Sequence, residues 1–375
     1  MPERAESLAT ELKRGLDAPI CLTWELTYAC NLACVHCLSS SGRRDPKELT
    51  TAEAKALLDE LRALQVFYIN VGGGEPMIRR DFFELVEYAT SSGIGVKFST
   101  NGAFLGPEEA RKLAAMDYLD VQISLDGIDA ATNDPIRGRG SYDIARAAMD
   151  NLRDAGFGPF KISVVVTRDS VAQLDDFKAL AQSYGAQLRV TRLRPSGRGA
   201  DTWHSLRPTN EQQRIIYRWL LANGEDVLTG DSFFHLNALG EPLPGLNMCG
   251  AGRVVCLIDP IGEVYACPFV IHDEFRAGSV RDRGGFSEVW KRSALFTSLR
   301  QPESAGACAS CGSYDACQGG CMAAKFFTGL PLDGPDPECV YGHGDELLAV
   351  GVAGTAPRPS SDHSKPAPVA FRRRA

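Results

Sequence analysis

The chain lacks the run of about 20 apolar residues that a membrane-spanning helix needs, and it lacks the basic and apolar segments of a secretory signal. It also has no excess of basic residues, because 40 Lys and Arg stand against 47 Asp and Glu, a formal charge of −7. A nucleic-acid surface would need a basic stripe. We therefore expect a cytoplasmic globular protein that binds neither a membrane nor a nucleic acid.

Cysteine is absent from residues 38–248, although the chain has 12 cysteines. Four of them lie in residues 21–37 and eight in residues 249–339. In a large chain without a signal sequence, such clusters indicate metal or redox chemistry rather than disulfides. The distribution predicts two cysteine-bearing units joined by a cysteine-free scaffold.

The scaffold alternates apolar, β-branched runs with helical patterns. Six strands and five helices in alternation predict a parallel sheet, either an open doubly wound sheet or an incomplete barrel. In both folds, ligands bind at the carboxyl ends of the strands. A capping box of Thr50 and Glu53 marks the first helix. The expected strands cover 21–27, 67–72, 95–100, 118–125, 161–166 and 187–192, and the expected helices cover 51–64, 81–91, 107–115, 142–155, 171–184 and, beyond the scaffold, 210–223.

Cys30, Cys34 and Cys37 form a C-x3-C-x2-C loop directly after the first strand. Three thiolates can hold three irons of a 4Fe–4S cube and leave the fourth iron open. An open iron can chelate a methionine moiety, and one electron passed to the bound sulfonium would release a carbon radical. The alternative is a zinc site assisted by His36, although zinc normally takes paired ligand sets.

Polar and glycine-rich segments end the next three strands. Glycines allow a ligand to approach the backbone closely, Glu75 suits a ligand ammonium, and hydroxyl and amide groups suit a ribose. Each segment alone also fits an ordinary turn. Their occurrence on consecutive strands beside the cysteine loop predicts one ligand site. The segments are Gly73-Gly74-Glu75-Pro76, Ser99-Thr100-Asn101-Gly102 and Ser124-Leu125-Asp126-Gly127.

The three cysteines followed by the Gly-Gly-Glu-Pro segment resemble the radical S-adenosylmethionine (SAM) superfamily over roughly residues 20–200. The resemblance implies a partial (β/α)6 barrel with a SAM-cleaving cluster on the three cysteines. It also implies that the Gly-Gly-Glu-Pro segment binds the methionine amino group. The remaining implied cofactor contacts are Ser99, Asn101 and Ser124, at ribose or methionine, and Arg137, at the cofactor carboxylate.

The eight later cysteines make two sets of four ligands, which fit either two structural zinc sites or two iron–sulfur clusters. Their spacing resembles the SPASM extension of radical SAM enzymes, which implies two auxiliary 4Fe–4S clusters. The seven-cysteine pattern does not require Cys256, and a free Cys256 would leave one auxiliary cluster with an open iron. The leftover Cys21 is expected to be a small core residue. The implied ligand sets are Cys249, Cys256, Cys267 and Cys321, and Cys308, Cys311, Cys317 and Cys339.

Four segments resemble the mycofactocin radical SAM maturases more specifically, within a similarity that covers residues 15–345. The resemblance implies action on the C-terminal Val-Tyr of a precursor peptide. The tyrosine would lose a β-hydrogen, carbon dioxide and an electron, and a second SAM turnover would join it to valine by a carbon–carbon bond. The auxiliary clusters would accept the electron, and no side chain beyond the cluster ligands is assigned to catalysis. The segments are 22–27, 35–42, 192–199 and 326–339.

About 20 residues precede the first strand, which is too few for a peptide-binding domain. We therefore expect a small separate carrier protein for the peptide, together with an external one-electron donor. The alternatives are a sulfatase-type or thioether-forming maturase and a zinc-stapled, non-catalytic binding protein. Arg198, His204 and His235 are candidate substrate contacts, for which ordinary packing is the simpler interpretation. The expected domains are an N-terminal extension (1–19), the barrel (20–230), the SPASM domain (231–345) and a disordered basic tail (346–375).

Overall fold

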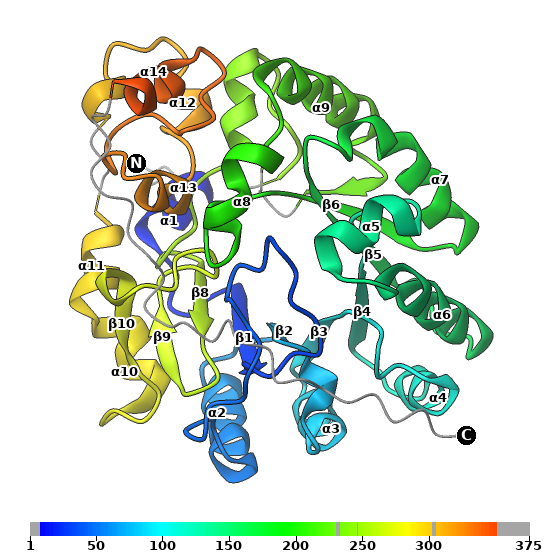
Figure 1. The fold of residues 1–375 in the computed structure, drawn as a ribbon. Helices are drawn as coiled ribbons and strands as arrows, with labels where there is room; N and C mark the ends of the chain where they lie inside the picture. Colours follow the sequence, from blue (N-terminus) through cyan, green and yellow to red (C-terminus); the bar gives the residue numbers. More distant parts are fainter. Residues whose placement is uncertain (1–7, 230–232, 246, 302–304, 351–375) are drawn as a thin grey trace, which may run out of the picture.

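The computed structural model describes residues 8–229, 233–245, 247–301 and 305–350. Its centre is an arc of six parallel strands in which each strand pairs with the next along the chain (Figure 1). The sheet does not close on itself within the described residues, which makes the fold a partial barrel. All six predicted strands are confirmed: β1 (Cys21–Thr27), β2 (Tyr68–Gly73), β3 (Gly95–Thr100), β4 (Leu119–Ser124), β5 (Lys161–Val166) and β6 (Gln187–Arg192).

The predicted helices lie along the outer side of the arc (Figure 1). The capping box between Thr50 and Glu53 is present, and the last scaffold helix begins with a short 3-10 turn, η2 (Val171–Gln173). Between β1 and α9, two short helices were not predicted, α5 (Ala130–Arg137), which contains Pro135, and α8 (Gly199–Leu206). The confirmed helices are α2 (Thr51–Ala63), α3 (Phe82–Ser91), α4 (Pro107–Ala114), α6 (Ser141–Asp154), α7 (Leu174–Ser183) and α9 (Asn210–Asn223).

The cysteine-rich part continues the same sheet. Its strand β8 pairs in parallel with β1, and β9 and β10 follow in antiparallel order, while β7 extends the other edge next to β6. The short strands are β7 (Val227–Leu228), β8 (Val255–Ile258), β9 (Glu263–Tyr265) and β10 (Arg276–Ser279). The remaining helices are α1 (Leu8–Arg14), α10 (Gly285–Arg292), α11 (Ala294–Leu299), α12 (Tyr314–Cys317), α13 (Met322–Phe327) and α14 (His343–Ala349), with 3-10 turns η1 (Pro76–Ile78), η3 (Phe234–Leu239), η4 (Asp273–Phe275) and η5 (Gly306–Cys308).

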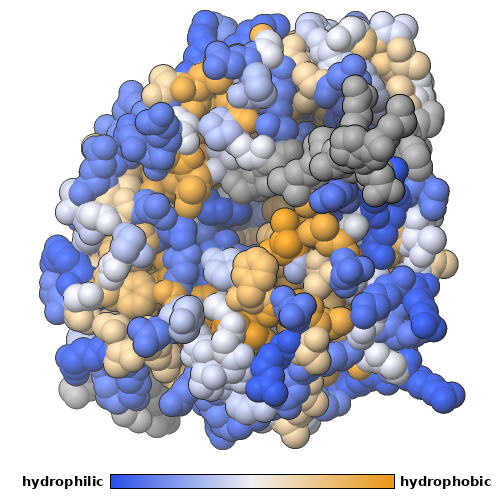
Figure 2. Space-filling view, turned by 180° about the vertical axis from the view of Figure 1, so that it is seen from behind, coloured by the Kyte–Doolittle hydropathy of each residue, from blue (hydrophilic) through white to orange (hydrophobic). Residues whose placement is uncertain are grey.

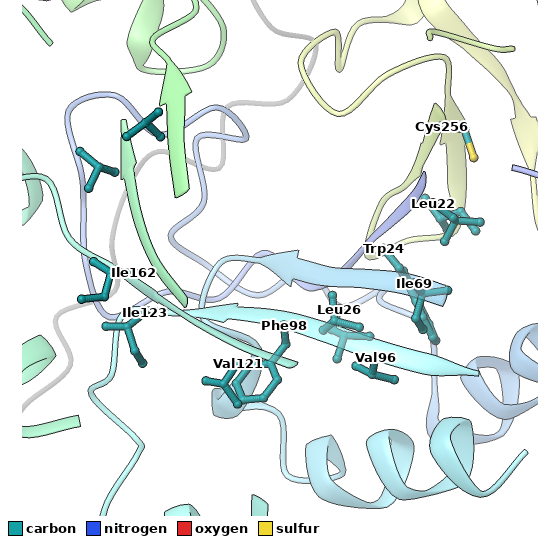
Figure 3. Close-up of a cluster of buried hydrophobic side chains, with 14 of the residues drawn as sticks. Leu22, Trp24, Leu26, Ile69, Val96, Phe98, Val121, Ile123, Ile162 and Cys256 are labelled. Carbon is teal, nitrogen blue, oxygen red and sulfur yellow. The ribbon is translucent and has the colours of Figure 1, made fainter. Parts of the chain in front are cut away.

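The strands bury one apolar face against the helices. Trp24, Phe98 and Ile123 are almost fully buried there, and Figure 3 shows such side chains pointing away from the inner side of the arc. Buried parallel strands are normally apolar on both faces. Here the opposite face carries polar side chains, which indicates that the interior of the arc receives a polar ligand. These inner residues include Thr23, Asn70, Lys97, Gln122, Ser163 and Arg189.

The outer surface is mostly hydrophilic. Seen from behind, hydrophobic residues gather around a hollow near the centre of the face (Figure 2). No described helix is long and apolar enough to cross a membrane. The predicted disordered tail falls, from residue 351 onward, outside the described residues.

Candidate functional site

A cavity of about 460 Å³ opens inside the arc of strands. It brings together most of the cofactor residues that the sequence predicted, although they are spread over more than 200 positions. Among the predicted SAM contacts, Pro76 is the exception, because it lies buried at the start of η1 and does not line the cavity. The predicted residues in the lining are Cys30, Cys34, Cys37, Gly73, Gly74, Glu75, Ser99, Asn101, Ser124, Arg137, Cys249, Cys267 and Cys321.

The loop that carries the first three cysteines is held by the segment after β6. The Arg198 guanidinium donates from Nε to the carbonyl of Cys34 at 2.9 Å and from Nη1 to the carbonyl of Ser41 at 2.8 Å. Gly197 lies so close that a Cβ there would be 2.3 Å from the carbonyl oxygen of Cys37. Arg198, a candidate substrate contact, therefore positions the cysteine loop.

Replacing Arg198 with Met is expected to speed the loss of iron from the loop to a chelator by about ten-fold or more. The variant loses two charge-assisted hydrogen bonds, each worth about 1.5–3 kcal/mol, so the loop opens more often. Anaerobic chelator kinetics followed by absorbance measure the rate. Arg153→Met, on the exposed side of α6, is the control. Equal rates in the two variants would refute the positioning role.

A buried ion-pair group closes another side of the loop. Asp126 Oδ2 lies 2.6 Å from His36 Nε2 and 2.6 Å from Arg137 Nε, and the latter contact lacks hydrogen-bond geometry. Burial alone would raise the pKa of Asp126, but the charges of Arg137 and His36 outweigh it and hold the pKa well below its usual range. His36, the extra ligand of the zinc interpretation, is thus paired with a carboxylate. Arg137, which was predicted to face the cofactor carboxylate, lines the cavity and is paired with the Asp126 carboxylate.

The glycine segment after β2 passes very close to the cysteine loop. Gly74 donates its N–H to the carbonyl of Thr27 at 2.7 Å, and a Cβ on Gly74 would be 2.0 Å from the carbonyl oxygen of Ala29. A Cβ on Gly72, by contrast, would meet nothing within 4 Å, because that position faces the cavity. The glycines therefore serve two needs, close backbone approach at Gly74 and open space for a ligand at Gly72.

Glu75 ties β2 to the end of β3. Its carboxylate accepts hydrogen bonds from Thr100 Oγ1 at 2.9 Å, the N–H of Asn101 at 2.8 Å and the N–H of Met77 at 3.2 Å. Burial raises the pKa of Glu75 to about 7, and these hydrogen bonds oppose the rise. Glu75 therefore fixes the relative position of two strand ends that line the cavity.

The polar groups on the following strand ends also meet in the cavity. Asn101 Nδ2 donates to Asn31 Oδ1 on the cysteine loop at 2.8 Å, and Ser99 Oγ accepts from Gln122 Nε2 at 2.9 Å. Ser124 lines the same space at the end of β4. Hydroxyl and amide groups of this kind fit the hydroxyl-rich ribose that the sequence predicted.

The chemistry of the cysteines fits a metal cluster. Burial raises the pKa of Cys30 to about 12 and that of Cys34 to about 11. A buried thiolate is stable only beside positive charge, which bound iron supplies. Within the described ranges, no three His, Cys, Asp or Glu side chains converge in the way that ligands of one metal ion would.

The later cysteines separate into two places. Cys249, Cys267 and Cys321 line the main cavity together with the loop cysteines. Cys256 is fully buried in the apolar core, because alternation along β8 turns Val255 into the cavity and Cys256 to the other face (Figure 3). The other predicted set surrounds a second cavity of about 320 Å³ and consists of Cys308, Cys311, Cys317 and Cys339.

Arg192, at the end of β6, links the barrel to the segment before Cys339. Its guanidinium forms buried ion pairs with Asp336 and Glu338. Asp336 Oδ2 also accepts the N–H of Cys321 at 2.7 Å. His235, another candidate substrate contact, is buried beside Arg192 rather than in the main cavity. This group holds the two cysteine sets in a fixed relation.

Two more predictions concern the single residues His204 and Cys21. His204 lies on α8 against the Trp203 ring and does not line the main cavity. Cys21 faces the cavity, where it accepts a hydrogen bond from Asn70, instead of packing in the apolar core. Lys97 and Arg189, two cations inside the arc, were not predicted, although each stands between two apolar residues of its strand.

Comparison with known proteins agrees with this geometry. Residues 24–180 match the radical SAM superfamily, and residues 249–312 match the SPASM iron-sulfur cluster-binding domain. SuiB of Streptococcus suis, in a structure with bound S-adenosylmethionine, has a TM-score of 0.69 at 17% identity, covering 87% of this chain and 78% of SuiB. A structure of anSMEcpe with bound AdoMet has a TM-score of 0.65 at 16% identity, covering 90% of this chain and 100% of that one. The fold and the site thus define a radical SAM enzyme with a SPASM domain and iron–sulfur clusters, as predicted.

One relative identifies the family of this chain more specifically. The mycofactocin maturase MftC of Mycolicibacterium smegmatis is 66% identical over 370 residues, covering 97% of this chain and 94% of that protein. The chain belongs to the mycofactocin maturase family. The resemblance that its sequence segments predicted is therefore confirmed.

Proposed function

We propose that this enzyme oxidatively decarboxylates the C-terminal tyrosine of the mycofactocin precursor peptide and then joins it to the preceding valine. One observation carries the proposal: a single cavity contains the three-thiol loop, the polar strand ends and three SPASM cysteines. The 66% identity to a mycofactocin maturase supports the substrate. A crystal structure of SuiB bound to the precursor peptide SuiA supports peptide binding by this fold.

Different residues of the cavity would bind different parts of the cofactor. Cys30, Cys34 and Cys37 would hold the SAM-cleaving 4Fe–4S cluster, and the backbone around Gly72 and Gly73 would receive the methionine moiety. Ser99, Asn101 and Ser124 would contact the ribose or methionine. Bound there, S-adenosylmethionine supplies a carbon radical that takes a hydrogen atom from the substrate.

The reaction then changes the substrate in two steps. Tyrosine loses a hydrogen atom from Cβ, the bond between Cα and the carboxylate carbon breaks, and carbon dioxide leaves as a Cα–Cβ double bond forms. One electron remains, and Cys249, Cys267 and Cys321 would place an acceptor cluster in the same cavity. In a second SAM turnover, valine loses a hydrogen atom, its carbon radical adds to the double bond, and the adduct takes up one electron and one proton, so the crosslinked product is an isomer of the alkene. The enzyme needs no protein base for hydrogen-atom abstraction, in contrast to proton transfer.

The second cysteine set would hold a further auxiliary cluster at Cys308, Cys311, Cys317 and Cys339. We propose that an external one-electron donor reduces the enzyme and that a small separate carrier protein presents the peptide. The division into a barrel up to residue 230 and a SPASM domain from residue 231 also stays a proposal. It falls between β7 and η3, near the end of the barrel strands.

The test is anaerobic incubation of the reduced enzyme with SAM, the carrier and a precursor ending in Val-Tyr. Mass spectrometry is expected to show first a peptide that has lost carbon dioxide and two hydrogens, and then its crosslinked isomer. A precursor ending in Val-Phe is a matched substrate that isolates the role of the phenol. A Val-Tyr peptide recovered unchanged while SAM is cleaved would contradict the proposal, and a thioether product would favour the alternative maturase.

A further inference from the structure

Three cations line the main cavity with neither a carboxylate within ion-pair distance nor the pair of backbone carbonyls that Arg198 has, among the described residues. Lys97 lies on β3 and Arg189 on β6, both on the inner face of the arc, and Arg194 lies just after β6. Arg189 Nη1 contacts only a neutral hydroxyl, Ser163 Oγ, at 3.4 Å. Arg194 is about 6% exposed, and its Nε has no hydrogen-bond partner.

The protonated, positively charged forms of these side chains are destabilised at these positions. Burial, followed by the nearby charge of Arg189, lowers the pKa of Lys97 to about 8, although Cys21 and the more distant Asp120 oppose the shift. Burial also lowers the pKa of Arg189, with Cys21 opposing the shift and Arg194 adding to it. Like charges that are close together and removed from water destabilise one another unless an anion joins them.

Other cations of the same barrel have carboxylate partners. Arg192 has both Asp336 and Glu338, Arg137 has Asp126, and Lys161, on the same inner face as Lys97, has Asp120. Lys97, Arg189 and Arg194 line the cavity without such a partner within ion-pair distance.

We infer that Lys97 and Arg189, with Arg194 adding positive charge, bind the C-terminal carboxylate of the substrate peptide. This inference rests on the proposed function and names the group that the cavity recognises. SAM does not supply the negative charge that would neutralise these cations, because its carboxylate is offset by its own ammonium and sulfonium groups. A peptide that ends in a free carboxylate does supply it, and the same carboxylate is the group that the reaction removes.

The terminal carboxylate also fixes the order of the two steps. The carboxylate holds the terminal residue against β3 and β6 until carbon dioxide leaves. The decarboxylated peptide has no terminal anion, so the attraction ends when the first step is complete. The peptide end is then free to shift toward the geometry that the valine crosslink requires.

The test compares binding of two precursor peptides, one with a free C-terminal acid and one with a C-terminal carboxamide. Anaerobic holoenzyme with SAM, carrier and no reductant is titrated with fluorescent peptide, so no turnover occurs. The acid is expected to bind about ten- to hundred-fold more tightly than the amide, as charge-assisted hydrogen bonds allow. Lys97→Met and Arg189→Met are each expected to remove most of this preference while the amide binds as before.

Two further variants serve as controls for this binding experiment. Lys55→Met, on the outer helix α2, is expected to retain the full preference, and Arg189→Lys, which keeps the charge, is expected to retain part of it. A preference that survives in Lys97→Met and Arg189→Met would overturn the inference. So would weaker SAM binding in these variants with the acid preference intact, because the cations would then serve the cofactor.

A failure of the proposed function would give a different result from a failure of the carboxylate site. If the wild-type enzyme takes up SAM but binds neither peptide, the choice of substrate is wrong. If it binds both peptides equally well and decarboxylates the acid, the substrate stands and only the carboxylate site is refuted.

Discussion

Replacing Cys30, Cys34 and Cys37 together with alanine is expected to abolish SAM cleavage and to lower the iron content by about four atoms per chain. The loop offers these three thiols to a cluster, so their removal takes away all the cysteine ligands that the loop supplies. Iron analysis and detection of 5′-deoxyadenosine in an anaerobic, reduced sample measure the two effects.

The matched control is the alanine variant of Cys308, Cys311 and Cys317, which line the second cavity. It also removes three thiols and is expected to lose a similar amount of iron. It should nevertheless still cleave SAM in the absence of peptide, because its cavity is separate from the SAM site. Zinc in place of iron in the wild-type protein would instead support the zinc-stapled alternative.

Replacing Gly74 with alanine is expected to destabilise the protein by about 3 kcal/mol and to prevent tight SAM binding. The added Cβ would lie 2.0 Å from the carbonyl oxygen of Ala29, which is backbone and cannot turn away. Either β2 or the cysteine loop must move, and both form the cofactor site. Thermal unfolding followed by circular dichroism and equilibrium dialysis of SAM are the measurements.

Gly72→Ala separates the packing role of this segment from its ligand role. A Cβ at Gly72 meets nothing within 4 Å, so the melting temperature should stay at the wild-type value. SAM should still bind more weakly, because the new methyl group projects into the cavity. Equal melting temperatures for the Gly74 and Gly72 variants would contradict the account of the close approach.

Local patterns in the sequence were sufficient for the barrel and for most of the site. Each strand has a β-branched run of its own, and each predicted ligand group lies at a strand end, where parallel strands place such groups together. The loop cysteines and the residues Ser99, Asn101 and Ser124 therefore meet in the cavity as expected. Pro76, in contrast, points into the protein because η1 begins there.

Contacts between distant segments could not be predicted in the same way. The pairing of β8 with β1 joins residues more than 200 positions apart, and a four-residue strand carries no signal for its partner. The same pairing fixes which face of β8 meets the cavity and so turns Cys256 into the core. Arg198 gave no local sign that it would hold the loop, since its two acceptors are carbonyl groups of Cys34 and Ser41.

A signal for Lys97 and Arg189 was present in the sequence. Val96-Lys97-Phe98 and Leu188-Arg189-Val190 place one cation between apolar residues within a strand. In a parallel sheet covered by helices, such a residue must face the inside of the barrel. Strand alternation therefore predicts a charged interior, whereas the absence of carboxylate partners depends on the fold.

The central claim is that the loop of three thiols and the strand ends beside it form one site that cleaves SAM. The most direct measurement is the yield of 5′-deoxyadenosine from oxygen-free, iron-loaded protein given SAM and a strong reductant. The account predicts its steady formation, with none in the Cys30, Cys34 and Cys37 alanine variant. Protein that carries iron at the loop and still leaves SAM intact would contradict it.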